Sequence, residues 1–374
     1  MDADPARAPA PATTTRRRRV TLLVAWSIGS GFALLLMFEG CASVIRALRE
    51  AAPNAARASS AREHTEYDPE LGWVNRANVH LPDLYGPDRP FTTDDLAFRA
   101  TRSAHARTTP ARVRIVCSGD SFTMGFGVGD DDAWCRLLES HLPDTESINL
   151  GVGGYGVGQA YLRYRRNLDT LAHDVHLFAF ISADFERLAE DEFLGFGKPL
   201  LQLDDDRLVT RNVPVPGPAL GEHDAFPIRR AVSLLHSVEI LREMSSGGAG
   251  PAERAAGRSP PDRVAAKVFE ELKALSRERG IDLVLVHLPT RQDYMSKPAP
   301  SDWRVFAAKE AARLGLPFID VTAAMRRLPR REVDTLFRGH YSERGNAFVA
   351  ATIADRIRES LGRTPTGTAA GPSR

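Results

Sequence analysis

The chain of 374 residues has little cysteine and no excess of charge of either sign. Its three cysteines, Cys41, Cys117 and Cys135, are too few for a disulfide framework, and their spacing does not fit a zinc site. Lys and Arg number 49 against 48 Asp and Glu, a net charge of +1, so the composition does not indicate a nucleic-acid partner. A Cys117–Cys135 bridge would need an oxidising compartment, and the sequence favours two separate buried thiols.

Motifs for phosphate and for metal are also missing. The stretch GDSFTMGFGVG at residues 119–129 is rich in glycine, but it contains neither GxGxxG nor GKS/T. The acidic run at residues 204–206 is explained by a solvated turn rather than by a calcium site. We therefore expect no metal and no cofactor.

An uncharged apolar run at residues 20–38, VTLLVAWSIGSGFALLLMF, stands out near the N-terminus. As a helix it would be about 28 Å long, close to the roughly 30 Å thickness of the hydrocarbon core. Four arginines at residues 16–19 precede it and should stay in the cytoplasm. The run predicts a single transmembrane helix at residues 20–40 in the inner membrane, with the rest of the chain on the periplasmic side. A cleaved signal peptide and a buried core helix are the alternatives, but a signal peptide has a shorter apolar core and a clean A-x-A site.

Composition divides the remainder of the chain. Small, polar and charged residues at both ends and after the anchor predict tails and a linker around one folded domain. The expected parts are a cytoplasmic tail at 1–19, a linker at 41–64, a domain at 65–362 with an insertion at about 186–258, and a tail at 363–374.

The domain alternates apolar β-rich runs with helical patterns. The runs lie at residues 113–119, 146–152, 174–184, 281–289 and 317–322. Such alternation predicts an α/β fold with a parallel sheet covered on both faces, which binds ligands at the carboxyl ends of its strands. The residues expected at that edge are Ser121, Gly154, Asp184 and His287, together with the segment before His340.

Ser121 follows Gly-Asp at the end of the first run, so it is a candidate nucleophile. A serine hydroxyl needs a base, usually a histidine within hydrogen-bond reach. His340 is the best candidate because FRGHYSERGN is a polar, glycine-containing loop that leads into the last helix. His287 ends an apolar run and is a second candidate for the cleft.

Three blocks carry a family resemblance. GDSFTMGFGV (119–128), NLGVGGYG (149–156) and HYSERGN (340–346) resemble blocks of the SGNH, or GDSL-type, hydrolases, in the same order. The stretch at residues 67–101 resembles the N-terminal segment of membrane-anchored members. The resemblance implies a flavodoxin-like three-layer α/β/α sandwich that hydrolyses or transfers ester acyl groups, often acetyl groups on carbohydrate.

By the same resemblance, Ser121 is the nucleophile and His340 the base. The backbone N–H groups of Ser121 and Gly154 form part of the oxyanion hole, where a glycine lets the backbone approach the substrate oxygen. Asp120 is expected to brace the loop, and it joins His287 and Arg338 among the cleft candidates.

Two positions depart from the family pattern. Ala183 stands where the family has an asparagine whose amide completes the oxyanion hole, and losing one such donor costs about 10²–10³ in rate. An amide from elsewhere, such as Asn212, is one substitute. Arg338 and Phe337 stand where the family places an aspartate before the histidine. Candidates for the orienting acid are Asp334, Asp184 and Glu343, and a bare Ser–His dyad is the other option.

Two functions follow from these residues. The first is a membrane-anchored esterase or O-acyltransferase that acts on ester groups, acetyl groups above all, of an envelope or exported carbohydrate. The second is a catalytically impaired relative that binds a glycan or assists a polysaccharide-modifying partner. Retention of both Ser121 and His340 favours the enzyme. Its expected partners are an acylated small molecule or carbohydrate and the membrane, with no nucleic acid.

Overall fold

The computed structural model describes two compact units of the chain. The described residues are 22–34, 36–37, 40, 63–104, 113–193, 196–217, 258–295 and 302–361. The smaller unit covers residues 1–57 and 221–250, and the larger covers 58–220 and 251–374. The predicted tails at 1–19 and 363–374, and nearly all of the linker at 41–64, lie outside the described residues.

In the smaller unit, residues 22–34 and 36–37 are helical. Their large apolar side chains are exposed, from Val24 at 53% to Trp26 at 79%. Within the described part of the chain, no helix combines the length and the apolar character that crossing a membrane requires. The span at residues 20–40 stays a prediction.

A five-stranded parallel sheet forms the centre of the larger unit. Its strand order is β13 (Phe318–Asp320), β12 (Asp282–His287), β7 (Val175–Phe180), β5 (Val113–Ser118) and β6 (Thr145–Asn149). Every neighbouring pair is parallel. Counted along the chain, the order is 2-1-3-4-5, the flavodoxin-like arrangement. The predicted parallel α/β fold is confirmed.

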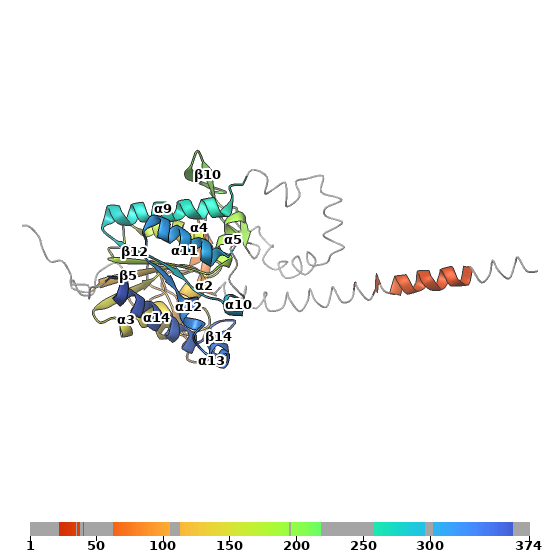
Figure 1. Cartoon of the computed structure of the whole chain (residues 1–374), viewed down its shortest axis with the longest axis horizontal. Coiled ribbons are helices and arrows are strands. Elements are labelled where there is room, and N and C mark those ends of the chain that lie inside the picture. Colours follow the sequence, from red (N-terminus) through yellow and green to blue (C-terminus); the bar gives the residue numbers. More distant parts are fainter. Residues whose placement is uncertain are drawn as a thin grey trace, which may run out of the picture. The chain divides into compact units, whose positions relative to one another are not determined.

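Helices cover both faces of this sheet (Figure 1). One face carries α4 (Val157–Asn167), α9 (Pro261–Arg279) and α11 (Trp303–Leu314), and the other carries α3 (Trp134–His141), α12 (Val321–Met325) and α14 (Glu343–Leu361). Two separate apolar clusters result because the inner strands β5 and β7 are buried along their whole length, with alternate side chains on the two faces. One is built around Phe178, Phe269 and Leu285, and the other around Leu177, Trp134 and Ile353. The three-layer sandwich therefore follows from uninterrupted apolar strands.

Short elements surround this core. Before the sheet, residues 63–104 form an N-terminal segment with β1 (Thr65–Asp68), β2 (Gly72–Asn75), β3 (His80–Leu81) and β4 (Phe91–Thr92). The predicted insertion contains an antiparallel hairpin of β10 (Leu200–Asp204) and β11 (Arg207–Arg211). The other short elements are α2 (Ser121–Met124), η1 (Asp130–Asp132), α5 (Ala183–Glu186), η2 (Arg187–Ala189), β8 (Glu192–Phe193), β9 (Phe196–Gly197), α10 (Arg291–Met295), α13 (Arg330–Thr335), β14 (Phe337–Arg338) and β15 (His340–Tyr341).

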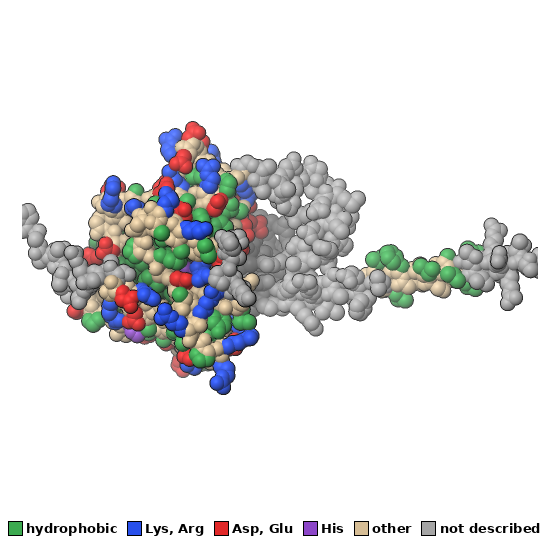
Figure 2. All heavy atoms as spheres, in the orientation of Figure 1, with side chains coloured by type: hydrophobic (Ala, Val, Ile, Leu, Met, Phe, Trp, Pro, Cys, Tyr) green, Lys and Arg blue, Asp and Glu red, His purple; other side chains and the backbone are tan. Residues whose placement is uncertain are grey.

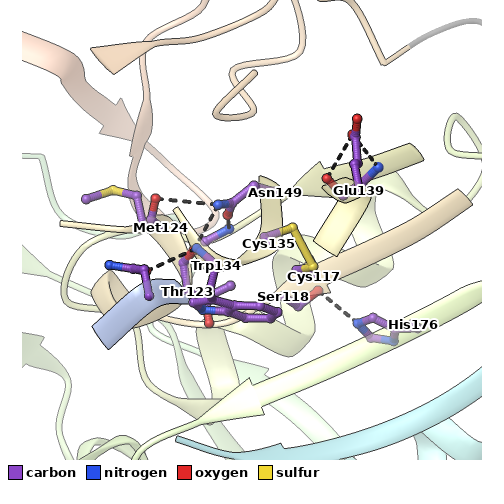
Figure 3. Close-up of a disulfide and its surroundings, with 12 residues drawn as sticks. Cys117, Ser118, Thr123, Met124, Trp134, Cys135, Glu139, Asn149 and His176 are labelled. Carbon is purple, nitrogen blue, oxygen red and sulfur yellow. Dashed lines mark hydrogen bonds between the residues drawn. A yellow bond between two sulfur atoms is a disulfide. The ribbon is translucent and has the colours of Figure 1, made fainter. Parts of the chain in front are cut away.

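Cys117 and Cys135 form a disulfide between β5 and α3 (Figure 3). Their Cα atoms are 6.3 Å apart, and both residues are fully buried. The expectation of two separate thiols was wrong. Sequence does not show the cause, which is that α3 packs back against the end of β5 and brings the two side chains together.

Candidate active site

Ser121 is the first residue of α2, directly after the tight turn at Gly119 and Asp120 that follows β5. Asp120 caps α2, since its Oδ1 accepts a hydrogen bond from the Phe122 backbone N–H at 2.9 Å. Gly125 ends the helix in the left-handed conformation at φ +85°. Strand β5 lies between β6 and β7, so Ser121 sits where the strand order reverses, the usual ligand position in such sheets.

His340 reaches Ser121 from the other end of the chain. It lies on β15, which pairs with β14 across Gly339 at φ +83° and leads into α14. The Ser121 Oγ and His340 Nε2 atoms are 2.8 Å apart, a hydrogen bond over 219 positions of sequence. The predicted meeting of these two side chains is confirmed.

Gly154 has a backbone that only glycine adopts without strain. Its φ is +80°, and a Cβ there would lie 2.8 Å from Phe193 Cε1 and 3.3 Å from Trp73 Cζ2. The Trp73 Nε1–H donates to the Gly153 carbonyl at 2.8 Å, so the N-terminal segment holds this glycine loop in place. Trp73 was missed in the sequence because its partners are about 80 residues away.

Arg99 braces the loop that follows the nucleophile. Its Nη1 donates to the carbonyls of Met124 and Gly125 at 2.8 and 2.6 Å, and its Nη2 to that of Val128 at 2.7 Å. Its Nε donates to Asp130 at 3.0 Å, and both side chains are almost fully buried. This arginine was also missed, because nothing local distinguishes it from the chain's many surface arginines.

Two buried carboxylates lie behind the nucleophile turn. Asp184 accepts from Arg187 Nη1 at 2.6 Å, and the same nitrogen lies 3.9 Å from Asp120 Oδ2. Burial raises the pKa of Asp120, although Arg187 and backbone N–H groups oppose the shift. Burial and the neighbouring Asp120 raise the pKa of Asp184 well above its usual range. Asp120 and Asp184 therefore brace the turn as one network around Arg187.

The three acids proposed to orient the imidazole have other partners. Asp184 bonds to Arg187, as above, and Asp334 accepts from Arg291 at 2.7 Å on the exposed surface. Glu343 pairs with Arg89 at 2.9 Å and with Arg338 at 3.3 Å. The structure does not bring any of the three to the His340 ring as a hydrogen-bond partner.

The remaining cleft candidates lie at different depths. Arg338 is exposed. Its backbone lies opposite that of His340 in the β14–β15 ladder, but its guanidinium forms an ion pair with Glu343. His287 is fully buried, with Nδ1 3.1 Å from Thr322 Oγ1 and Nε2 3.3 Å from Ser182 Oγ. His287 therefore does not reach Ser121 or His340 directly and bonds to Thr322 and Ser182 instead.

Asp320 is the charged neighbour of His287. Burial raises the pKa of Asp320, but the His287 ring, 3.8 Å away, and Arg304, at 2.8 Å, outweigh it and hold that pKa at about 2. The carboxylate is therefore ionised across the physiological range.

Ala183 and Asn212 are the two residues that bear on the expected oxyanion hole. Ala183 is half-buried and packs against the apolar cluster around Leu177. The Asn212 amide donates to the Lys198 carbonyl at 2.7 Å, so this side chain is held at the end of the β10–β11 hairpin. Over the described residues, no group of three or more His, Cys, Asp or Glu side chains could hold a metal ion.

No family model and no curated protein matches the chain. Solved structures do match it. A member of the lipolytic protein G-D-S-L family from Veillonella parvula is 16% identical, with a TM-score of 0.36 over 67% of this chain and 99% of that one. The lipase/acylhydrolase from Enterococcus faecalis is 16% identical, with a TM-score of 0.37 over 66% and 96%. The alpha/beta hydrolase enzyme LAE5 from the Lake Arreo metagenome is 16% identical, with a TM-score of 0.39 over 68% and 97%.

At such low TM-scores the likeness is loose. The interpretation of the site therefore depends on its own geometry.

Proposed function

We propose that this protein is a membrane-anchored esterase or O-acyltransferase of the SGNH type, acting on acetyl esters of an envelope or exported carbohydrate. The observation that carries the proposal is the 2.8 Å contact between Ser121 Oγ and His340 Nε2 at the switch point of the sheet. A nucleophile and a base within hydrogen-bond reach are what acyl transfer requires.

The chemistry runs in two halves. Ser121 Oγ attacks the ester carbonyl carbon and gives its proton to His340 Nε2. The bond from that carbon to the alcohol oxygen breaks, and the departing alcohol takes the proton from His340. Water or a sugar hydroxyl then attacks the acyl-serine, losing its proton to His340, which returns it to Ser121 Oγ.

Negative charge on the carbonyl oxygen needs donors in both halves. The backbone N–H groups of Ser121 and Gly154 fill this role in the proposal, and the left-handed φ at Gly154 fixes the direction of its peptide. Ala183 supplies no side-chain donor. We therefore expect a slower enzyme than one with a complete set of three donors.

Two features support export and anchoring. The buried Cys117–Cys135 disulfide is typical of proteins folded in an oxidising compartment. The exposed apolar side chains of residues 22–34, 36 and 37 suit a lipid environment better than water (Figure 2). Both fit a domain on the periplasmic side of the inner membrane.

The second candidate function is a glycan-binding relative with impaired catalysis. Ala183, together with the engagement of Asp184, Asp334 and Glu343 elsewhere, favours it. Such a protein would keep the cleft and lose turnover.

The test uses the full chain in detergent micelles. A chromogenic acetyl ester measures turnover, and a fluorophosphonate probe measures the reactivity of the serine. We expect wild type to hydrolyse the ester and take up the probe, and Ser121→Ala and His340→Ala to lose nearly all of both. Ser118→Ala is the matched control, because Ser118 bonds to His176 at 2.9 Å inside the core. Equal turnover by wild type and Ser121→Ala would favour the binding protein.

A further inference from the structure

His340 lies in the middle of a column of five rings. Its imidazole centroid is 4.6 Å from that of Phe122 and 4.7 Å from that of Phe126, with interplanar angles of 38° and 40°. Beyond Phe126 comes Tyr85 at 5.0 Å, and beyond Phe122 comes Tyr341 at 4.9 Å. Three parts of the chain, far apart in sequence, build this column.

Both ends of the column are fixed. Tyr341 is buried, and its hydroxyl donates to the Pro289 carbonyl at 2.7 Å. Tyr85 packs edge-on against Phe91 at 6.2 Å, and the Arg99 guanidinium lies 5.9 Å from its ring centroid. Each of the two rings that contact the imidazole, Phe122 and Phe126, is therefore held by a further ring that is itself fixed.

The flanking rings come from the nucleophile turn itself. Phe122 follows Ser121 directly, and the Phe126 backbone N–H donates to the Ser121 carbonyl at 3.0 Å. Any movement of the turn carries both rings with it. The rings thus tie the plane of the imidazole to the turn that carries Ser121, in addition to the hydrogen bond between Nε2 and the Ser121 hydroxyl.

We propose that Phe126 is a positioning residue, which with Phe122 holds the His340 ring so that Nε2 stays on Ser121 Oγ. The proposal deepens the acyl-transfer function and rests on it. The arrangement sets only the plane of the ring and adds no group that touches the substrate. Its effect should appear in the chemical step, since an error of about 1 Å in catalytic geometry can cost about 10²-fold in rate.

Phe126 is the better of the two rings to change. It is half-buried, whereas Phe122 is buried in the core and supports Tyr341. Phe126→Leu keeps an apolar side chain and removes the ring, and Phe126→Tyr keeps the ring. Phe306→Leu on α11 is the matched control, because Phe306 is also half-buried and packs against Trp303 and Phe185.

The experiment measures kcat and KM for the acetyl ester and the midpoint of thermal unfolding, using the full chain in micelles. We expect Phe126→Leu to lower kcat by about tenfold or more with little change in KM. Phe126→Tyr should restore kcat to near the wild-type value, and Phe306→Leu should leave it unchanged. A higher KM at constant kcat would make Phe126 a substrate contact and overturn the proposal. Equal kcat in Phe126→Leu and wild type would also overturn it.

A second readout does not depend on activity. The imidazole protons of His340, assigned in histidine-labelled protein by comparison with His340→Ala, should resonate upfield because two aromatic rings have centroids within 4.7 Å of the imidazole centroid. Phe126→Leu should move them downfield, and Phe306→Leu should not. If the His340 protons of wild type are not shifted upfield, the ring contacts with Phe122 and Phe126 are absent in solution and the proposal is wrong. A wild type that shows the shift but never hydrolyses an ester would instead sink the proposed function.

Discussion

Arg99 and Gly125 are joined by a 2.6 Å hydrogen bond that crosses from the N-terminal segment to the nucleophile loop. The donor lies upstream of the sheet, and the acceptor ends the helix that begins with Ser121. The same guanidinium reaches the Met124 and Val128 carbonyls. A segment that looks like a connector is therefore part of the site.

Replacing Arg99 tests this dependence. Arg99→Met removes every one of these donors and leaves Asp130 buried without its cation, which should cost about 3–5 kcal/mol of stability. Urea unfolding measures the loss. In Arg99→Met/Asp130→Asn, stability should partly return while ester turnover stays low, because the carbonyls of the loop still lack their partner. Full recovery of turnover would contradict a bracing role.

Gly154→Ala separates backbone strain from steric conflict. The change combines a left-handed φ with a Cβ 2.8 Å from the Phe193 ring. Gly280→Ala is the matched control, since Gly280 has φ +67° and no atom within 4 Å of the new Cβ. We expect Gly280→Ala to cost about 1 kcal/mol and Gly154→Ala more, with most of the turnover lost. Thermal unfolding and the ester assay measure the two effects, and equal costs at the two sites would remove the steric argument.

The raised pKa of Asp184 makes stability depend on pH. For a carboxyl whose pKa is higher in the folded than in the unfolded state, stability falls as pH rises from the unfolded value through the folded one. Asp184→Asn removes that titration. The free energy of unfolding of the variant minus that of wild type should therefore increase as pH rises from 4.5 to 7, by at most about 1.4 kcal/mol per pH unit. Urea unfolding at three pH values checks this, and a difference that stays constant would show that Asp184 is ionised throughout.

The disulfide should matter for stability and little for chemistry. Cys117→Ala/Cys135→Ala opens a loop of 18 residues and should cost about 2–4 kcal/mol. At temperatures below its lowered unfolding midpoint, the double variant should still be labelled at Ser121 by the fluorophosphonate probe. Cys41→Ala is the control and should change neither property. Identical thermal midpoints for the double variant and wild type would argue against the bridge, and mass spectrometry of unreduced peptides would decide the matter.

Sequence predicted the parts that depend on local pattern. Apolar runs revealed the strands of the sheet, and the short blocks around Ser121 and His340 revealed the two ends of one hydrogen bond. Trp73, Arg99 and Phe126 escaped because their roles arise from packing between distant segments. The disulfide escaped for the same reason. Ala183 was visible in the sequence, but only the structure shows that Asn212, the suggested substitute, is held elsewhere.

The burial of both sulfur atoms sets an order of events. Once the core has closed around Cys117 and Cys135, an external oxidant has no path to them. The bond must then form while α3 can still lift away from the first strand of the sheet. A chain that completed its packing in a reducing environment would keep Cys117 and Cys135 as two buried thiols. After transfer to an oxidising environment, the disulfide would form only if the core around them partly unfolded.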